Sequence, residues 1–153
     1  MKLHFLYGTE TGSAEFLCED IIEALDDDTL ETEVSVLADV DPAALIAGIF
    51  YVVVTSTFGN GDLPSNAQPF ADALDASQPD LSHVRFAIFG LGDMVFSATF
   101  NQGSEQLMDK MRARGATMVG ERGIHDASTG DMPEDIAGPW AQGILASLRA
   151  DVS

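Results

Sequence analysis

Lysine and arginine are absent from residues 3–84, although that stretch holds 16 of the chain's 25 carboxylates. Over all 153 residues, 7 Lys and Arg stand against 25 Asp and Glu, and the formal net charge is −18. Nucleic acids and anionic membranes repel such a chain, so we expect neither as a partner. Two explanations of the acidity stay open: solubility, including life in high salt, and an electronegative face that docks a basic protein.

Other absences narrow the class of protein further. The single cysteine, Cys18, excludes an intramolecular disulfide, is compatible with a reducing cytoplasm, and is expected in the core. His4, His83 and His125 are scattered, so no metal site is expected. No apolar run approaches the roughly 18–20 residues of a membrane span, and the first residues resemble a strand and not a signal peptide. We therefore expect residues 1–153 to form one domain, monomeric and cytoplasmic.

Strand-like and helix-like segments alternate along the chain. Short apolar or alternating runs predict strands over residues 3–7, 33–37, 49–54, 85–89 and 116–120. Apolar residues at helical spacing predict a helix opening at Gly12 and further helices over residues 66–74, 104–114 and 134–149. The buried face expected for the first helix consists of Phe16, Leu17, Ile21, Ile22 and Leu25. Five strands interleaved with helices predict an α/β fold, an open parallel sheet with helices on both faces.

Loops rich in Gly, Ser and Thr follow the first, third and fourth expected strands, so all three are expected at one edge of the sheet. In the first loop, Thr9, Thr11 and Ser13 offer hydroxyls, and Gly12 permits close approach of a ligand to the backbone. The N–H groups at the start of the helix would complete an anion site without cations. The loop lacks the lysine of nucleoside-triphosphate loops and the dinucleotide glycine pattern, which favours a monophosphate. The alternative is that Thr11 or Ser13 only caps the helix.

The other two loops place an aromatic residue among glycines. Phe58 stands in an otherwise polar loop, where one face of a stacking site is its plausible use; a tight turn with a half-buried Phe is the alternative. In the third loop Phe96 offers a second aromatic surface, whereas Phe100 is expected to anchor the loop to the next helix. Asp93 either accepts a hydrogen bond from a heterocycle or caps its turn. Two aromatics beside a phosphate cradle describe a planar ring with a phosphorylated side chain.

These residues resemble the flavodoxin family. Thr9-x-Thr11-Gly12-Ser13-Ala14-Glu15 is similar to the phosphate loop of the flavodoxin-like domains of diflavin reductases. The second and third flavin loops of those domains are similar to Thr55-Ser56-Thr57-Phe58-Gly59-x-Gly61-Asp62-x-Pro64, followed by Asn66-Ala67, and to Gly90-x-Gly92-Asp93. The later segment Met132-Pro133-Glu134-Asp135-Ile136 with Trp140, together with residues 79–86, is similar to the short MioC-type flavodoxins. The resemblance covers essentially the whole chain.

The resemblance implies a flavodoxin-like three-layer sandwich with strand order 2-1-3-4-5 and flavin mononucleotide (FMN) as cofactor. The residues that it assigns to the phosphate are Thr9, Glu10, Thr11, Gly12, Ser13 and Ala14. Those assigned to the ring and its surroundings are Thr55, Ser56, Thr57, Phe58, Gly59, Asn60, Gly61, Leu91, Gly92, Asp93, Phe96, Phe100 and Asn101. Asp126 is a further candidate for the flavin edge. Phe96 departs from the family, which usually has Tyr there.

The implied function is a one-electron carrier between a separate reductase and an acceptor protein, both docking transiently through basic faces near the flavin. A quinone or azo reductase of flavodoxin-like fold is the alternative from another class, and NAD(P)H turnover by the pure protein would identify it. A receiver-type phosphoacceptor domain shares the strand order. It needs clustered acids after the first strand and a lysine after the fifth, where this chain has Gly8-Thr9 and no such lysine.

Overall fold

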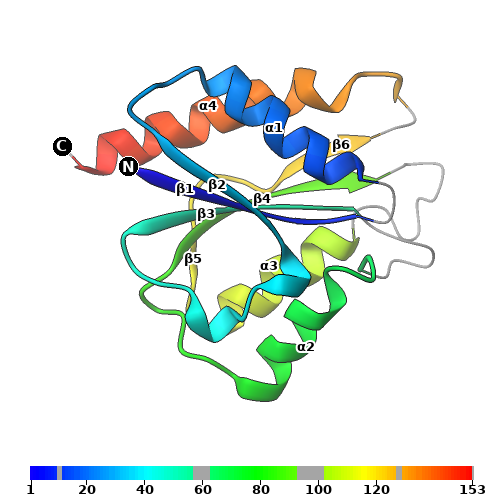
Figure 1. The fold of residues 1–153 in the computed structure, drawn as a ribbon, viewed down its shortest axis with the longest axis vertical. Helices are drawn as coiled ribbons and strands as arrows, with labels where there is room; N and C mark the ends of the chain where they lie inside the picture. Colours follow the sequence, from blue (N-terminus) through cyan, green and yellow to red (C-terminus); the bar gives the residue numbers. More distant parts are fainter. Residues whose placement is uncertain (10–11, 57–62, 93–101, 127–128, 153) are drawn as a thin grey trace.

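The structure, a computed structural model, describes residues 1–9, 12–56, 63–92, 102–126 and 129–152. Its centre is a sheet of parallel strands in the order β2-β1-β3-β4-β5 (Figure 1). The strands are β1 (Lys2–Gly8), β2 (Glu31–Val36), β3 (Ile49–Ser56), β4 (Arg85–Gly92) and β5 (Thr117–Met118). This order confirms the flavodoxin-like sheet that the sequence predicts.

The edge beside β4 differs from the expectation. The strand predicted over residues 116–120 is reduced to β5, and a sixth strand, β6 (Gly123–Asp126), pairs with the second half of β4. Between these two paired stretches the strands are unequal in length: residues 119–122 on one side face residues 87–88 of β4 on the other. Gly120, whose φ is +74°, lies in this interruption. The left-handed backbone there ends the ladder and lets it resume two residues out of register.

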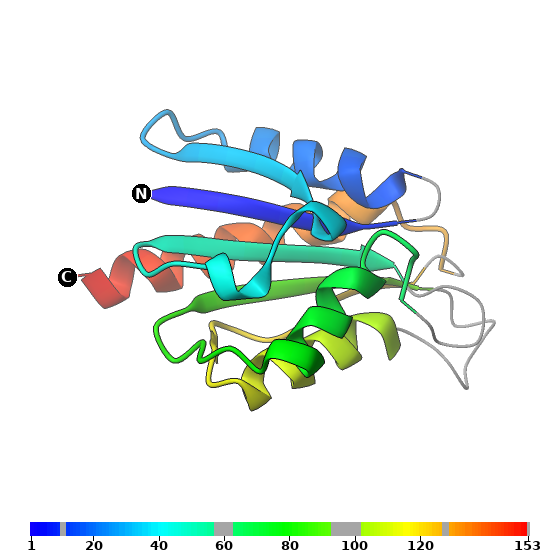
Figure 2. The same cartoon turned by 60° about the horizontal axis from the view of Figure 1, so that its bottom comes forward.

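Helices cover both faces of the sheet (Figures 1 and 2). On one face lie α1 (Ser13–Leu25) and α4 (Pro133–Val152), and on the other lie α2 (Gln68–Ser77) and α3 (Gln102–Ala113). Two short 3-10 turns, η1 (Leu37–Asp39) and η2 (Pro42–Ala44), connect β2 to β3. Of the helices in the described residues, none combines the length and apolarity needed to cross a membrane.

Each face of the sheet carries its own apolar core. Side chains alternate along β3, so Tyr51 and Val53 pack toward α2 and α3, whereas Phe50, Val52 and Val54 pack toward α1 and α4. Burial on both faces explains why the sequence of this strand is almost continuously apolar. Strand β2, at the end of the sheet, shows the opposite pattern, with Glu31, Thr32 and Glu33 exposed.

The first helix buries the predicted face with one exception: Leu17 and Ile21 are buried, and Ile22 and Leu25 pack partly buried against the same core. Phe16 is 68% exposed, which overturns its assignment to the core. The buried residues of α1 are Ala14, Leu17, Cys18 and Ile21, and this confirms the prediction for Cys18. Their i, i+3, i+4 and i+7 spacing defines one stripe, and at 100° per residue Phe16 points away from it. Helix α2 runs from Gln68 to Ser77, later than the predicted 66–74.

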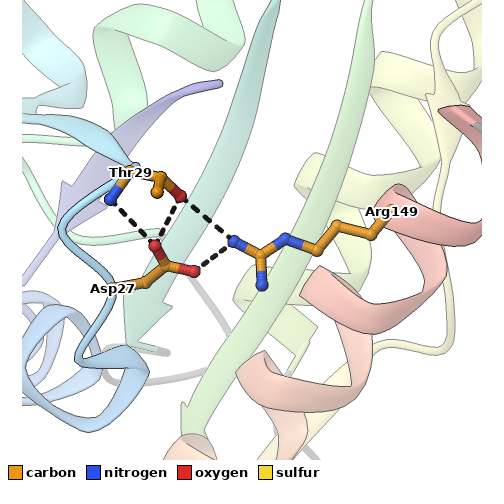
Figure 3. Close-up of polar contacts among 3 residues, drawn as sticks. All are labelled: Asp27, Thr29 and Arg149. Carbon is orange, nitrogen blue, oxygen red and sulfur yellow. Dashed lines mark hydrogen bonds and ion pairs between the residues drawn. The ribbon is translucent and has the colours of Figure 1, made fainter.

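A polar contact ties the end of α4 to the turn that follows α1. The guanidinium of Arg149 pairs with Asp27, whose carboxylate also accepts hydrogen bonds from the hydroxyl of Thr29 and, at 2.9 Å, from its backbone N–H (Figure 3). The hydrogen bonds from the Thr29 hydroxyl and from Arg149 lower the pKa of Asp27 to about 2. Two segments more than 100 residues apart are thereby joined.

We expect Asp27→Asn to destabilise the fold in a pH-dependent way. Because the pKa in the folded state lies below the unfolded value of about 3.9, the stabilisation is present above about pH 5 and is lost as the pH falls toward 2. Urea unfolding should therefore show a deficit in the variant at pH 7 that narrows between about pH 5 and pH 3. Asp28→Asn, a change at an exposed carboxylate in the same turn, is the matched control. A deficit independent of pH would contradict this assignment.

Candidate functional site

Strands β1, β3 and β4 end level with one another at the carboxyl edge of the sheet. Gly8 pairs with Thr55 across β1 and β3, and Ser56 pairs with Leu91 across β3 and β4. The three Gly-, Ser- and Thr-rich loops therefore leave the sheet at one edge, as the sequence predicts. This is also the edge where the strand order reverses, with β2 and β3 on either side of β1. Ligands of open α/β sheets bind at such a switch point.

Helix α1 begins directly at this edge, so the N–H groups of its first turn lie at the end of the sheet where a ligand would bind. Gly12 precedes the helix in the left-handed conformation, with φ of +86°, and contributes no side-chain cap. The first bond within the helix runs from the N–H of Phe16 to the C=O of Gly12, at 3.2 Å. The N–H groups of residues 13–15 precede that bond and lie at the positive end of the helix dipole. Among the residues that the structure describes, a Phe16 ring atom at 3.9 Å is the one neighbour that a Cβ on Gly12 would meet within 4 Å.

Two hydroxyls face each other across the first loop. The Oγ1 of Thr9 lies 3.3 Å from the Oγ of Ser13, and Thr9 is buried. Of the residues predicted for the phosphate, the structure thus brings Thr9, Gly12, Ser13 and Ala14 together at the start of α1. Glu10 and Thr11 lie outside the described residues.

The first loop is held by the segment that follows the second loop. The backbone N–H of Thr9 donates to the side-chain Oδ1 of Asn66 at 2.7 Å. Next to it, Ala67 is fully buried against Gly8: a Cβ on Gly8 would lie 2.5 Å from the Cβ of Ala67. Asn66 is absent from the predicted site residues. The amide in the pattern Pro64-x-Asn66-Ala67 was visible in the sequence, but its partner 57 residues away was not.

Only the first residues of the other two loops are described. Thr55 is fully buried, with its hydroxyl donating to the C=O of Ser56 at 3.2 Å, and Leu91 is buried beside Gly92 at the end of β4. These four residues lie at the predicted edge. The remaining predicted residues fall outside the described part of the chain: Thr57, Phe58, Gly59, Asn60, Gly61, Asp93, Phe96, Phe100 and Asn101.

The sixth strand brings a further carboxylate to the same edge. Asp126 pairs with Gly92 and His125 with Leu91, so both lie at the end of β4. The buried imidazole of His125 donates from Nε2 to the C=O of Asp131 at 2.6 Å and holds the start of the segment leading to α4. Asp126, a candidate for the flavin edge, therefore lies at the end of β4, at the same edge as the three loops.

The polar groups of the first loop are not supplemented by lysines or arginines from that part of the chain. Three cations of the chain pair with carboxylates elsewhere: Lys2 with Glu33 at 3.2 Å, Lys110 with Asp75 at 2.6 Å, and Arg149 with Asp27. Tyr7 lies beside this loop, and the pKa of its phenol is raised. The causes are burial of the phenol and the nearby carboxylate of Glu15, which accepts a hydrogen bond from it. Within the described residues no group of His, Cys, Asp or Glu is arranged to hold a metal ion. Hydroxyls and backbone N–H groups are the polar groups that the described part of the chain brings together at the start of α1.

Comparison with known proteins gives consistent relatives. The sequence model of a family described as Flavodoxin matches residues 5–140. The chain is 35% identical over 136 residues to Protein MioC of Escherichia coli K12, covering 87% of this chain and 88% of that protein. It is 30% identical over 151 residues to NADPH-dependent diflavin oxidoreductase 1 of Schizosaccharomyces pombe, covering 97% of this chain but 26% of the longer protein. Among solved structures, a cysteine-to-serine mutant of a flavodoxin from Pseudomonas aeruginosa superposes with a TM-score of 0.82 at 31% identity, covering 97% of this chain and 99% of that one.

We expect Gly8→Ala to destabilise the protein by about 1–3 kcal/mol, because the added methyl group meets Ala67 at a distance that neither backbone can accommodate. Gly143→Ala is the control, at an exposed position inside α4 where a Cβ has open space. That change should stabilise by about 0.5–1 kcal/mol through helix propensity. Urea unfolding measures both. Equal effects of the two substitutions would show that β1 does not approach residue 67 so closely.

Proposed function

The chain belongs to the flavodoxin family, and from this premise we propose that it is a one-electron carrier that takes electrons from a separate reductase and delivers them to an acceptor protein. FMN is the cofactor of that family. Flavin supplies chemistry that protein side chains lack, because it exchanges electrons singly or in pairs. What the chain itself supplies is binding, orientation and electrostatics.

The observation that carries the proposal is the fit between the first loop and a phosphate monoester. A left-handed glycine, an uncapped helix start and two facing hydroxyls lie together at the switch point of the sheet. A dianion is stabilised there by hydrogen bonds and by the helix dipole. A nucleoside triphosphate, by contrast, ordinarily requires a lysine in this loop.

We assign the two halves of the ligand to two sets of residues. The phosphate would be held by Thr9, Glu10, Thr11, Gly12, Ser13 and Ala14. The ring would lie between Phe58 and Phe96, with its polar edges near Thr55, Ser56, Thr57, Gly59, Asn60, Gly61, Leu91, Gly92 and Asp93. Phe100 and Asn101 would support the third loop from the side of α3.

The purified protein tests the proposal directly. We expect it to be yellow, or to become so on addition of FMN, and to bind one FMN per chain in isothermal titration calorimetry. It should not oxidise NADPH by itself, whereas an added NADPH-dependent reductase should reduce it. A colourless protein that gives no heat with FMN would overturn the proposal. Turnover of NADPH and a quinone by the protein alone would favour the enzyme alternative.

A matched pair of glycine substitutions locates the phosphate site. Gly12→Val places a branched side chain directly before α1, where the phosphate is proposed to bind, and should abolish FMN binding. Gly48→Val is the control, because Gly48 has a similar φ of +90°, lies in open space, and stands at the opposite edge of the sheet before β3. Both variants should lose about 1–2 kcal/mol of stability through left-handed strain, but only the first should lose FMN. Equal FMN affinity in the two variants would show that the phosphate does not bind at this loop.

We further propose that the partners dock through basic faces. Glu15, exposed in the first turn of α1, lies beside the proposed cofactor site, and the exposed Glu19 and Glu23 follow along the same helix, in a segment without cations. Such a field accelerates encounter with a cationic partner and is screened over about 10 Å at 0.1 M salt. Stopped-flow reduction by a basic reductase should therefore slow as NaCl rises. A rate that does not fall would mean that the acidic residues serve solubility and not docking.

We also propose that residues 1–153 act as one monomeric domain in the cytoplasm.

A further inference from the structure

We propose that Asn66 is a positioning residue that shapes the phosphate loop and couples it to the loop after β3. The inference rests on the proposed FMN site and names a residue that site does not contain. Asn66 is not assigned a contact with the ligand. It acts through Thr9, which lies in the loop itself.

The contacts of Asn66 join three segments that follow three neighbouring strands. Its side-chain Oδ1 accepts from the N–H of Thr9, which comes directly after β1, at 2.7 Å. Its backbone C=O accepts from the N–H of Ala38, in the turn after β2, at 2.8 Å. Asn66 itself lies in the connection from β3 to α2. One residue therefore fixes the carboxyl ends of β2, β1 and β3 relative to one another.

The position of Asn66 is itself firmly set. The N–H groups of Ala67 and Gln68 both donate to the C=O of Pro64, at 2.9 and 3.0 Å, which closes a turn around Asn66. Ala67 is buried against Gly8, where no Cβ can be accommodated. The amide oxygen of Asn66 is thus presented to Thr9 by a turn that packs on the end of β1.

This hydrogen bond fixes the backbone of Thr9 at the end of β1. The N–H of Thr9 is directed to Asn66, and its hydroxyl lies 3.3 Å from the Ser13 Oγ. Both hydroxyls then lie at the start of α1, where the phosphate is proposed to bind. Without the acceptor, the N–H of the buried Thr9 would lose its partner, and the loop would have to turn to satisfy it.

The experiment compares FMN with riboflavin, which has the same ring but no phosphate. In the full-length protein that binds flavin, Asn66→Ala should lower the ratio of the riboflavin Kd to the FMN Kd about tenfold. This is the effect expected from the loss of one buried hydrogen bond. The affinity for riboflavin should stay near that of the wild type. Gln68→Ala is the control, since its amide donates to Asp72 at 2.9 Å on the exposed side of α2 and should change neither affinity.

Two results would overturn the inference while leaving the proposed function intact. One is an unchanged preference for FMN in Asn66→Ala. The other is an equal loss of FMN and riboflavin, which would make Asn66 a general structural residue. If the variant does not fold, hydrogen exchange of the wild-type apoprotein decides the matter. The Thr9 amide should exchange at least tenfold more slowly than in an unfolded chain, and an unprotected amide would contradict the contact. A wild type that binds neither flavin would instead refute the proposed function.

Discussion

The geometry of the carboxyl edge depends on how closely the end of β1 approaches the turn before α2. Gly8 and Ala67 meet with no room for a Cβ on the glycine, and the Asn66 side chain completes the contact by accepting from Thr9. Because β1 lies between β2 and β3, an error in its position would displace both neighbours. The start of α1 follows only a few residues later, so dense packing at the end of β1 constrains where this helix begins.

A chain with a net charge of −18 that binds a dianion poses an electrostatic problem. A carboxylate about 10 Å from the phosphate costs roughly 0.4 kcal/mol per charge at the dielectric constant of water, and salt reduces this further. A hydrogen bond to a charged group contributes about 1.5–3 kcal/mol. A few short contacts from hydroxyls and helix N–H groups therefore outweigh many distant acids. The same acids can act at longer range on an approaching protein without preventing cofactor binding.

The sequence predicted those features that depend on local pattern. The apolar run of β3 and the alternation of strands and helices predicted the parallel sheet. The Gly-, Ser- and Thr-rich segments after three strands predicted that the site lies at the carboxyl edge. Phe16 was misplaced because apolar character was counted without its angle around the helix. Strand β6 was missed because its four residues, which include His and Asp, have no strand signal apart from their pairing with β4. The link from Asn66 to Thr9 could not be predicted, since it depends on a side chain meeting a backbone group 57 residues away.

The two borders of the sheet differ in construction yet have a common consequence. Along β2, Glu31 and Glu33 project into solvent beside unpaired backbone groups, so a second strand approaching there would bring like charges together. On the other border, the break between β5 and β6 leaves two short pieces that cannot template a long ladder. Neither border offers the long, flat, uncharged strand from which fibrils grow. Features that disfavour aggregation are thus built into the same sheet whose carboxyl edge carries the candidate site.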